Sequence, residues 1–284
     1  MKKILVPTDF SKTAKTAAEV AAGIAKKAGA ELILLHIIEE GSKGSFAVTG
    51  EVQYSNMEEK LFMLMLIKRS KQQMTKFAAD PIFNGVKVKS ELRMGSPFHG
   101  MRTIIAEQKV DLVVMGTTGV SGATEMIIGS NTEKVVRHAK CPVLTVQKKP
   151  SRSNFKNIVY ATSMSKDEEV FSRIVKTAQS MYDSTIHLVR INTPGNFQRD
   201  AVVKKYMQDF AKKLQLKNFT INVFNDVTEE EGIIYFADSI HADMIAMATH
   251  GRTGFAHVLA GSIAEDVVNH SKRPVLTFVV KHRK

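Results

Sequence analysis

The segment from Gly116 to Asn131, GTTGVSGATEMIIGSN, places four glycines in sixteen positions after an apolar run. Glycine has a conformational entropy cost inside ordered structure, so this cluster needs a physical reason. Gly116 and Gly119 would let the backbone turn sharply or approach a ligand closely. Gly129 and Ser130 stand where a helix is expected to begin, and the free N–H groups and positive dipole end of a helix attract phosphate.

Three polar residues extend this chemistry. Ser130 and Asn131 would add side-chain donors at the expected helix start. Asp9, in the stretch PTDFS, follows an apolar run and could bind a ribose hydroxyl or hold Mg²⁺ beside phosphates. Each residue also has a purely structural interpretation, because Asp9 and Ser130 could cap the helices that follow them. Together, in a strand–loop–helix context, they favour a nucleotide ligand.

Two better-known phosphate motifs are absent. The chain has no G-x-x-x-x-G-K-[ST] sequence, which excludes a P-loop. The first apolar run is followed by PTDFSKTA instead of G-x-G-x-x-G, which excludes the usual dinucleotide fingerprint.

The chain repeats itself. The 37 residues from Asp111 align without a gap on those from Asp243, with about 16 identities, which indicates an internal duplication. The loop residues Gly119, Gly122, Gly129 and Ser130 fall on Gly251, Gly254, Gly261 and Ser262. The opening KKILVPTDFSK likewise matches KNIVYATSMSK from Lys156. We therefore expect a domain at 1–148, a polar, proline-containing linker at 149–154 and a second domain at 155–284.

Each copy alternates short apolar runs with amphipathic stretches. Strands that are apolar on both faces and alternate with helices indicate a parallel sheet covered on both sides. We predict two tandem α/β domains, each with five parallel strands in the order 3-2-1-4-5. The ligand crevice would lie at the carboxyl ends of strands one and four, where the order reverses. The segment 39–55 has no counterpart of equal length in the second copy, and is either a lid over this crevice or a plain excursion.

These motifs resemble the universal stress protein family. The spacing of Gly116, Gly119, Gly129 and Ser130, joined to ILVPTDFS and LILLHII, is typical of that family, and the resemblance covers both halves of the chain. It implies a Rossmann-like fold of the adenine nucleotide alpha hydrolase type. It also implies a regulatory protein of the stress response that binds ATP or AMP, with Mg²⁺ able to accompany the nucleotide.

The resemblance also implies which residues surround the nucleotide. Around the base and ribose it places Pro7, Thr8, Asp9 and Ile37, with Met115 and Gly116 as the wall of the pocket and Thr118 and Gly119 near the ribose or the phosphates. Along the phosphate chain it places Gly129, Ser130 and Asn131.

The second copy departs from this pattern. Ala248 replaces the first loop glycine, Ser163 replaces the aspartate, and Arg190 replaces the histidine before the adenine-facing isoleucine. The residues retained for a second phosphate site are Gly251, Gly261 and Ser262. Because a carboxylate is a strong acceptor, its loss predicts that the first domain holds the main site. The second site is then weaker, empty or adapted to another ligand.

Composition narrows the class of partner. The formal net charge of +12 favours anionic partners, but the lysines are scattered over polar helix faces and tryptophan is absent, so nucleic acid is not expected. A single cysteine, Cys141, excludes an internal disulfide. No apolar run has the length of a signal peptide or a membrane helix, which predicts a cytoplasmic protein.

Catalysis is not expected from the side chains. No pair among the nine histidines has metal-ligand spacing supported by cysteine or carboxylate, so the protein is not expected to be an enzyme. Slow ATP hydrolysis, or self-phosphorylation at Ser130 or Thr132, stays open. A nucleotide-gated signalling module with an unknown protein partner is the first hypothesis, and a scaffold or small-ligand carrier with vestigial loops is the second. The final strands, PVLTVQ and PVLTFVV, could pair into an internal pseudo-dimer, with a further homodimer possible.

Overall fold

The computed structural model describes residues 1–39, 45–46, 52–53, 57–117, 128–150, 154–250 and 263–280. The elements of the first half are β1 (Lys3–Pro7), α1 (Lys12–Ala28), β2 (Glu31–Ile38), β3 (Ser45–Phe46), β4 (Val52–Gln53), α2 (Met57–Ala78), η1 (Pro81–Phe83), β5 (Val88–Met94), α3 (Pro97–Gln108), β6 (Leu112–Gly116), α4 (Ser130–His138) and β7 (Val143–Val146). Those of the second half are β8 (Asn157–Ala161), η2 (Lys166–Glu168), α5 (Glu169–Tyr182), β9 (Thr185–Asn192), α6 (Asp200–Lys213), β10 (Phe219–Asn225), α7 (Glu229–Ser239), β11 (Met244–His250), α8 (Ile263–His270) and β12 (Val275–Val280).

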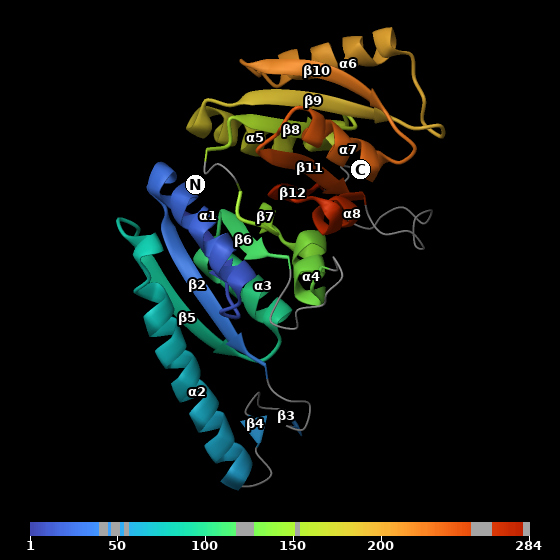
Figure 1. Cartoon of the computed structure of the whole chain (residues 1–284). Coiled ribbons are helices and arrows are strands. Elements are labelled where there is room, and N and C mark those ends of the chain that lie inside the picture. The colour runs from blue at the N-terminus through green and yellow to red at the C-terminus, as the bar shows by residue number, and fades with distance from the viewer. Residues whose placement is uncertain are drawn as a thin grey trace.

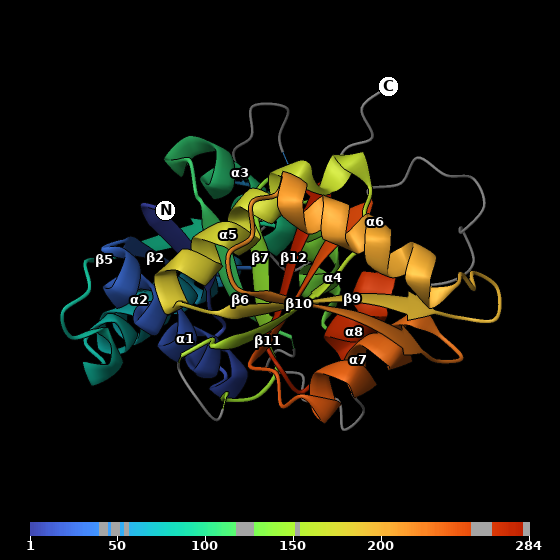
Figure 2. The same ribbon diagram turned by 90° about the horizontal axis from the view of Figure 1, so that it is seen from above.

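The strands of both halves join into one ten-stranded sheet. Its order is β10-β9-β8-β11-β12-β7-β6-β1-β2-β5, so each half has the predicted order 3-2-1-4-5. Within this sheet all pairs inside a half are parallel, whereas β7 and β12 pair antiparallel at the centre. Figures 1 and 2 show this sheet running through the whole molecule, with helices on both of its faces. The predicted tandem α/β architecture is confirmed.

Local sequence signals explain these elements. The central strands are buried on both faces, as their continuous apolar runs require. Helix α1 begins where the Ser11 hydroxyl accepts a hydrogen bond from the Ala14 amide, and it ends at Gly29 in the left-handed conformation with φ of 63°. Its face of small residues, Ala14, Ala17, Ala18, Ala21, Ala22 and Ala25, is buried.

The segment 39–55 is described only in part. Strands β3 and β4 form a short antiparallel ribbon, which is a separate two-stranded sheet. The choice between a lid and an excursion falls on the rest of that segment, outside the described residues. Within the described part of the chain, no helix is both long and apolar enough to cross a membrane.

The pairing of β7 with β12 has the reciprocity of a two-fold axis. Its register is Val275 with Thr145, Leu276 with Leu144 and Thr277 with Val143. In the internal repeat Leu276 is the equivalent of Leu144, so the two leucines lie at the centre of a symmetrical contact. Two threonine hydroxyls repeat the symmetry: Thr145 donates to the Val275 carbonyl at 3.2 Å and Thr277 to the Val143 carbonyl at 3.4 Å. The predicted pairing of the final strands is therefore found.

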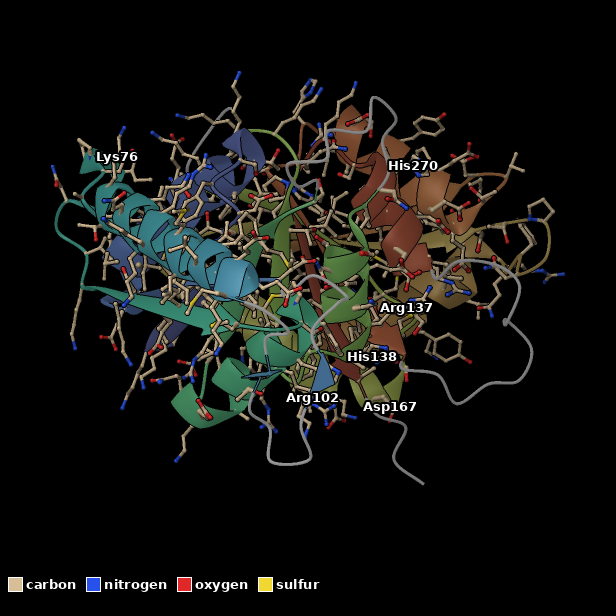
Figure 3. The ribbon with its side chains drawn as sticks, turned by 90° about the horizontal axis from the view of Figure 1, so that it is seen from below. Lys76, Arg102, Arg137, His138, Asp167 and His270 are labelled. Atoms are coloured by element: carbon tan, nitrogen blue, oxygen red, sulfur yellow. The ribbon has the colours of Figure 1, made fainter. Side chains whose placement is uncertain are left out.

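An ion pair crosses the same junction without this symmetry. Arg137 of α4, labelled in Figure 3, donates through Nε and Nη2 to the two carboxylate oxygens of Glu265 on α8, and also contacts Glu133 on its own helix. The repeat aligns Arg137 with Asn269, so the second half has no equivalent guanidinium. The Glu265 side chain is only 8% exposed, and the pairing raises the pKa of Arg137. This ion pair thus adds to the strand pairing one contact that only the first half supplies.

Replacing this arginine tests the strength of the junction. We expect Arg137→Ala to lower the free energy of unfolding by about 2 to 3 kcal/mol, because Glu265 stays largely buried without its main partner. The control Lys204→Ala, which removes an exposed pair with Asp200, should cost less than about 0.5 kcal/mol. Urea unfolding of both variants measures the difference. Equal losses would show that the Arg137 pair contributes no more than a surface contact.

Candidate functional site

The turn after β1 is held by two side chains. The Thr8 hydroxyl accepts a hydrogen bond from the Phe10 amide at 3.0 Å, and Phe10 has a left-handed φ of 64°. An Asp9 carboxylate oxygen accepts one from the Ser11 amide at 3.0 Å. Asp9 therefore braces the turn before α1, while Ser11 is the residue that caps the helix. Pro7 ends β1 directly before this turn.

The end of β2 lies against the same turn. His36 Nδ1 lies 2.8 Å from the Thr8 carbonyl oxygen, and the rings of His36 and Phe10 have centroids 4.5 Å apart. Ile37, the predicted adenine-facing residue, is half-buried and packs over Gly100 of α3. A side chain at Gly100 would lie 2.7 Å from Ile37 Cδ1, so this glycine sets how closely α3 approaches β2.

Gly116 ends β6 and meets helix α1. A Cβ atom at this position would lie 2.8 Å from Thr13 Cγ2 and 3.2 Å from the Thr13 carbonyl carbon. The bare backbone of Gly116 is thus required by close packing of the first turn of α1. The sequence suggested ligand approach as the reason, and the structure shows that packing alone already requires glycine here.

The first turn of α4 is bonded to the end of β6. The Gly129 amide donates to the Thr117 carbonyl at 2.8 Å, and the Thr132 hydroxyl donates to the Gly116 carbonyl at 3.0 Å. Gly129 is the capping residue of α4, so the capping alternative for Ser130 is not realised. Ser130 is exposed, and Thr132 is buried. Sequence reasoning missed this bracing role of Thr132.

The residues next to these hydrogen bonds are mostly apolar. Met115 is 6% exposed and belongs to a buried cluster with Leu35, Met101 and Ile104. It is therefore part of the hydrophobic core, whether or not it also contacts a ligand. The Thr117 hydroxyl is buried and has no hydrogen-bond partner among the described residues. Such an oxygen has a desolvation cost that a ligand or water would remove.

Several predicted site residues lie outside the described part of the chain. They are Thr118 and Gly119 of the first loop and Gly251, Gly261 and Ser262 of the second. Asn131 is half-buried and follows Ser130 in α4.

The second half contributes a hydrogen bond to the described residues just before α4 of the first. The Oδ1 atom of Asn269, on α8, accepts a hydrogen bond from the Ile128 amide at 2.8 Å, directly before Gly129. The Asn269 carbonyl accepts another from the Gln147 side chain at 3.2 Å. The start of α4 is therefore positioned partly by the other half of the molecule, a contact that sequence reasoning did not predict.

The corresponding turn in the second half has the same backbone and different chemistry. The Thr162 hydroxyl accepts a hydrogen bond from the Met164 amide at 2.9 Å, and Met164 has φ of 60°, as Phe10 has in the first half. The new group is Glu168, which is 1% exposed and stands where the first half has Ala14. Its carboxylate accepts hydrogen bonds from Tyr160 Oη, Thr162 Oγ1, the Ser163 amide and Oγ, and the Ser165 amide.

Glu168 corrects the expectation that the second half simply lacks a carboxylate here. The carboxylate is supplied from the start of the following helix, and the turn itself supplies its hydrogen-bond donors. Burial and the nearby Glu168 raise the pKa of Tyr160, which keeps that phenol protonated as a donor. Ser163, at the position of Asp9, donates inward to Glu168 through its hydroxyl. The hydrogen-bonding groups of this turn thus find partners in Glu168 and within the turn itself.

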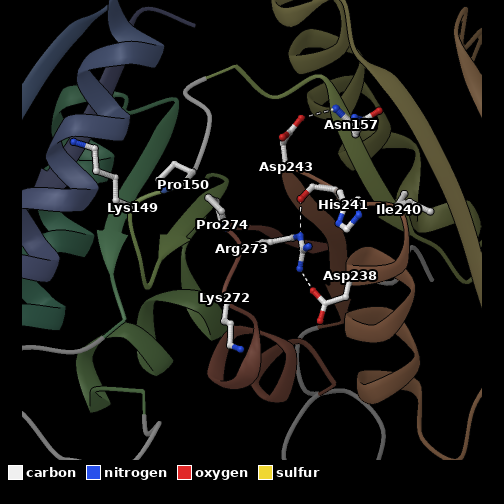
Figure 4. A pocket seen from close by; sticks show the side chains of 11 residues that line it. Lys149, Pro150, Asn157, Asp238, Ile240, His241, Asp243, Lys272, Arg273 and Pro274 are labelled. Atoms are coloured by element: carbon white, nitrogen blue, oxygen red, sulfur yellow. Dashed lines mark hydrogen bonds and ion pairs between the residues drawn. The ribbon is translucent and has the colours of Figure 1, made fainter.

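A separate hollow of about 730 Å³ lies at the amino ends of β8, β11 and β12 (Figure 4). Several of its charged groups are engaged in internal contacts. Asp243 accepts from the Lys156 and Asn157 amides, Arg273 pairs with Asp238, and Lys149 reaches Glu19. No group of three histidine, cysteine or acidic residues suited to a metal ion occurs among the residues with described positions. Burial raises the pKa of Cys141 to about 12, so this thiol is unreactive at neutral pH.

Removing the Glu168 carboxylate tests its role. We expect Glu168→Ala to destabilise the chain by about 4 kcal/mol, because several buried donors lose their acceptor together. Glu168→Gln should cost less, since it keeps one acceptor oxygen. Glu169→Ala is the matched control, because the Glu169 pair with Lys213 is at the surface. Thermal unfolding compares the three variants, and equal midpoints for Glu168→Ala and Glu169→Ala would contradict the expectation.

Comparison with known proteins agrees with this architecture. The model of the universal stress protein family matches residues 1–147 and again residues 154–279. The universal stress proteins MJ0531 and MJ0577 of Methanocaldococcus jannaschii are each 32% identical to this chain. The matches span 52% and 53% of the chain and 82% and 97% of those relatives.

A solved structure shows the whole fold. The crystal structure of a universal stress protein from Archaeoglobus fulgidus superposes with a TM-score of 0.75 at 19% identity, covering 98% of this chain and 96% of that one. With two successive matches to one family model, the chain belongs to the universal stress protein family as a tandem two-domain member.

Proposed function

We propose that this protein binds one adenine nucleotide, ATP or AMP, at the crevice of its first domain and acts as a regulatory protein of the stress response. One observation carries the proposal: hydrogen bonds from Gly129 and Thr132 hold the start of α4 against the end of β6. That start lies beside the point where the strand order reverses between β1 and β6, the usual ligand position in open α/β sheets.

The phosphate chain would lie on the first turn of α4. The amides of Thr132 and Glu133 already donate to the Gly129 carbonyl, so the amides of Ser130 and Asn131 are those offered to a phosphate. The exposed Ser130 hydroxyl and the Asn131 amide group add donors. Gly129, Thr118 and Gly119 complete this part of the proposed site, and Mg²⁺ would accompany the phosphates near Asp9.

The base and ribose would lie between the ends of β1 and β2. Support comes from the contacts that bring Pro7, Thr8 and Asp9 beside His36 and from the half-buried position of Ile37. Met115 and Gly116 would close the inner wall. The Thr117 hydroxyl, buried and unpartnered among the described residues, is an additional donor available there.

The second domain would not bind the same ligand with equal affinity. Glu168 already uses the hydroxyls of Thr162 and Ser163, and its buried negative charge would repel a phosphate. Residues Gly251, Gly261 and Ser262 would then form at most a weaker site. We keep 1–148 and 155–284 as the domain bounds, with the linker at 149–154.

The proposed role is non-catalytic and cytoplasmic. If the loop accepts a phosphoryl group, Ser130 is the accessible acceptor, because Thr132 is 4% exposed and its hydroxyl is bonded to the Gly116 carbonyl. A protein partner would distinguish the loop with nucleotide bound from the loop without nucleotide.

Calorimetric titration of the full chain with ATP and AMP tests this function. We expect one nucleotide per chain. Ser130→Ala should weaken binding about tenfold, since a hydrogen bond to a charged group is lost. The matched control is Ser262→Ala, the equivalent substitution in the second domain, which should leave the affinity unchanged.

Three results would contradict the proposal. Absence of affinity for either nucleotide would leave a scaffold or carrier of another ligand. Two equal sites per chain would overturn the assignment to the first domain. Equal effects of the two serine substitutions would do the same.

A further inference from the structure

Helix α2 carries an exposed apolar surface. The side chains of its first turns are largely open to solvent: Met57 78%, Leu61 53%, Phe62 62%, Leu64 63% and Met65 58%. We call these five residues the α2 patch. In Figure 1, α2 runs along the outer side of the first domain and reaches beyond the end of β2 and β5. A soluble monomer rarely exposes so many neighbouring large apolar side chains, which marks the patch as an interaction surface.

The periodicity of α2 separates this patch from the face that packs on the sheet. The buried residues are Met63, Ser70 and Met74, which share one side of the helix. On the opposite side the residues spaced by three and four are Glu58, Leu61, Met65 and Lys68. This is the spacing of a seam between two packed helices. Its centre is apolar and its two ends carry opposite charges.

This seam is complementary to itself when reversed. Leu61 and Met65 lie two positions on either side of Met63, and Glu58 and Lys68 lie five positions on either side. An identical helix running antiparallel, with its two-fold axis level with Met63, therefore sets Leu61 against Met65 and Glu58 against Lys68 at both ends. Both charged residues are exposed, and neither has an ion-pair partner among the described residues. A parallel pairing would instead place like charges together.

We propose that the α2 patch binds the α2 patch of a second copy of this chain, forming a symmetrical antiparallel helix pair. The contact is independent of the pairing of β7 with β12, which is already satisfied within one chain. It is also independent of the proposed nucleotide site. A contact of a few helical turns is small for a protein interface, so the dimer should be weak and depend on protein concentration.

Sedimentation velocity of the full chain over a range of concentrations tests the proposal. We expect a monomer–dimer equilibrium with the wild-type chain. Glu58→Lys alone and Lys68→Glu alone each place two like-charge pairs across the interface, and each should raise the dissociation constant about tenfold. The double variant Glu58→Lys/Lys68→Glu restores opposite charges at both ends and should return the dissociation constant to near the wild-type value.

The controls separate the seam from general charge effects. Lys60→Glu makes the same charge change on α2 outside the seam and should leave association unchanged. Leu61→Glu should abolish the dimer, and circular dichroism checks that the fold is kept. A chain that stays monomeric at all concentrations overturns the proposal, because the patch is then covered by something other than a second copy. A dimer that resists Leu61→Glu, or single variants not rescued by the double variant, also overturns it.

Discussion

The antiparallel pairing of β7 with β12 is the contact on which the architecture depends. Each half has an apolar sheet whose last strand would be an open edge if the half stood alone, and such edges invite uncontrolled pairing. Here the two edge strands pair with each other, with Leu144 opposite Leu276 and a symmetrical pair of threonine hydrogen bonds. Because this pair is antiparallel, the carboxyl ends of the two sets of strands point to opposite edges of the joined sheet. The crevice proposed for the first half and its counterpart in the second half would therefore face away from each other.

The two halves diverge where chemistry is expected and agree where folding requires it. The threonine that holds the first turn is kept in both halves, with a residue in the left-handed conformation two positions later. A single position makes the two turns chemically different. In the second half a buried glutamate stands at the position of Ala14, and the donors of the turn bind its carboxylate. The halves also cooperate, because Asn269 of the second half holds the Ile128 amide beside the α4 start of the first.

Much of the fold could be predicted from the sequence, and the reasons are visible in particular elements. The internal repeat and the alternation of apolar runs with helices predicted the strand order of each half and the pairing of the two final strands. Both depend on patterns along the chain. The roles of single residues were less accessible. Gly116 serves the packing of Thr13, and Glu168 reaches a turn from the next helix, since spacing along a chain does not say which way a side chain points. The Arg137 pair and the Asn269 bond join residues more than a hundred positions apart.

The short connection between β7 and β8 has a consequence for assembly. In a dimer of separate single domains, closing the central sheet is a second-order encounter that becomes slower on dilution. Covalent linkage makes the same closure a first-order event with a high effective concentration, set by the length of the connecting chain. The joined sheet can therefore re-form at any dilution, and each half always meets the one partner whose edge matches its own.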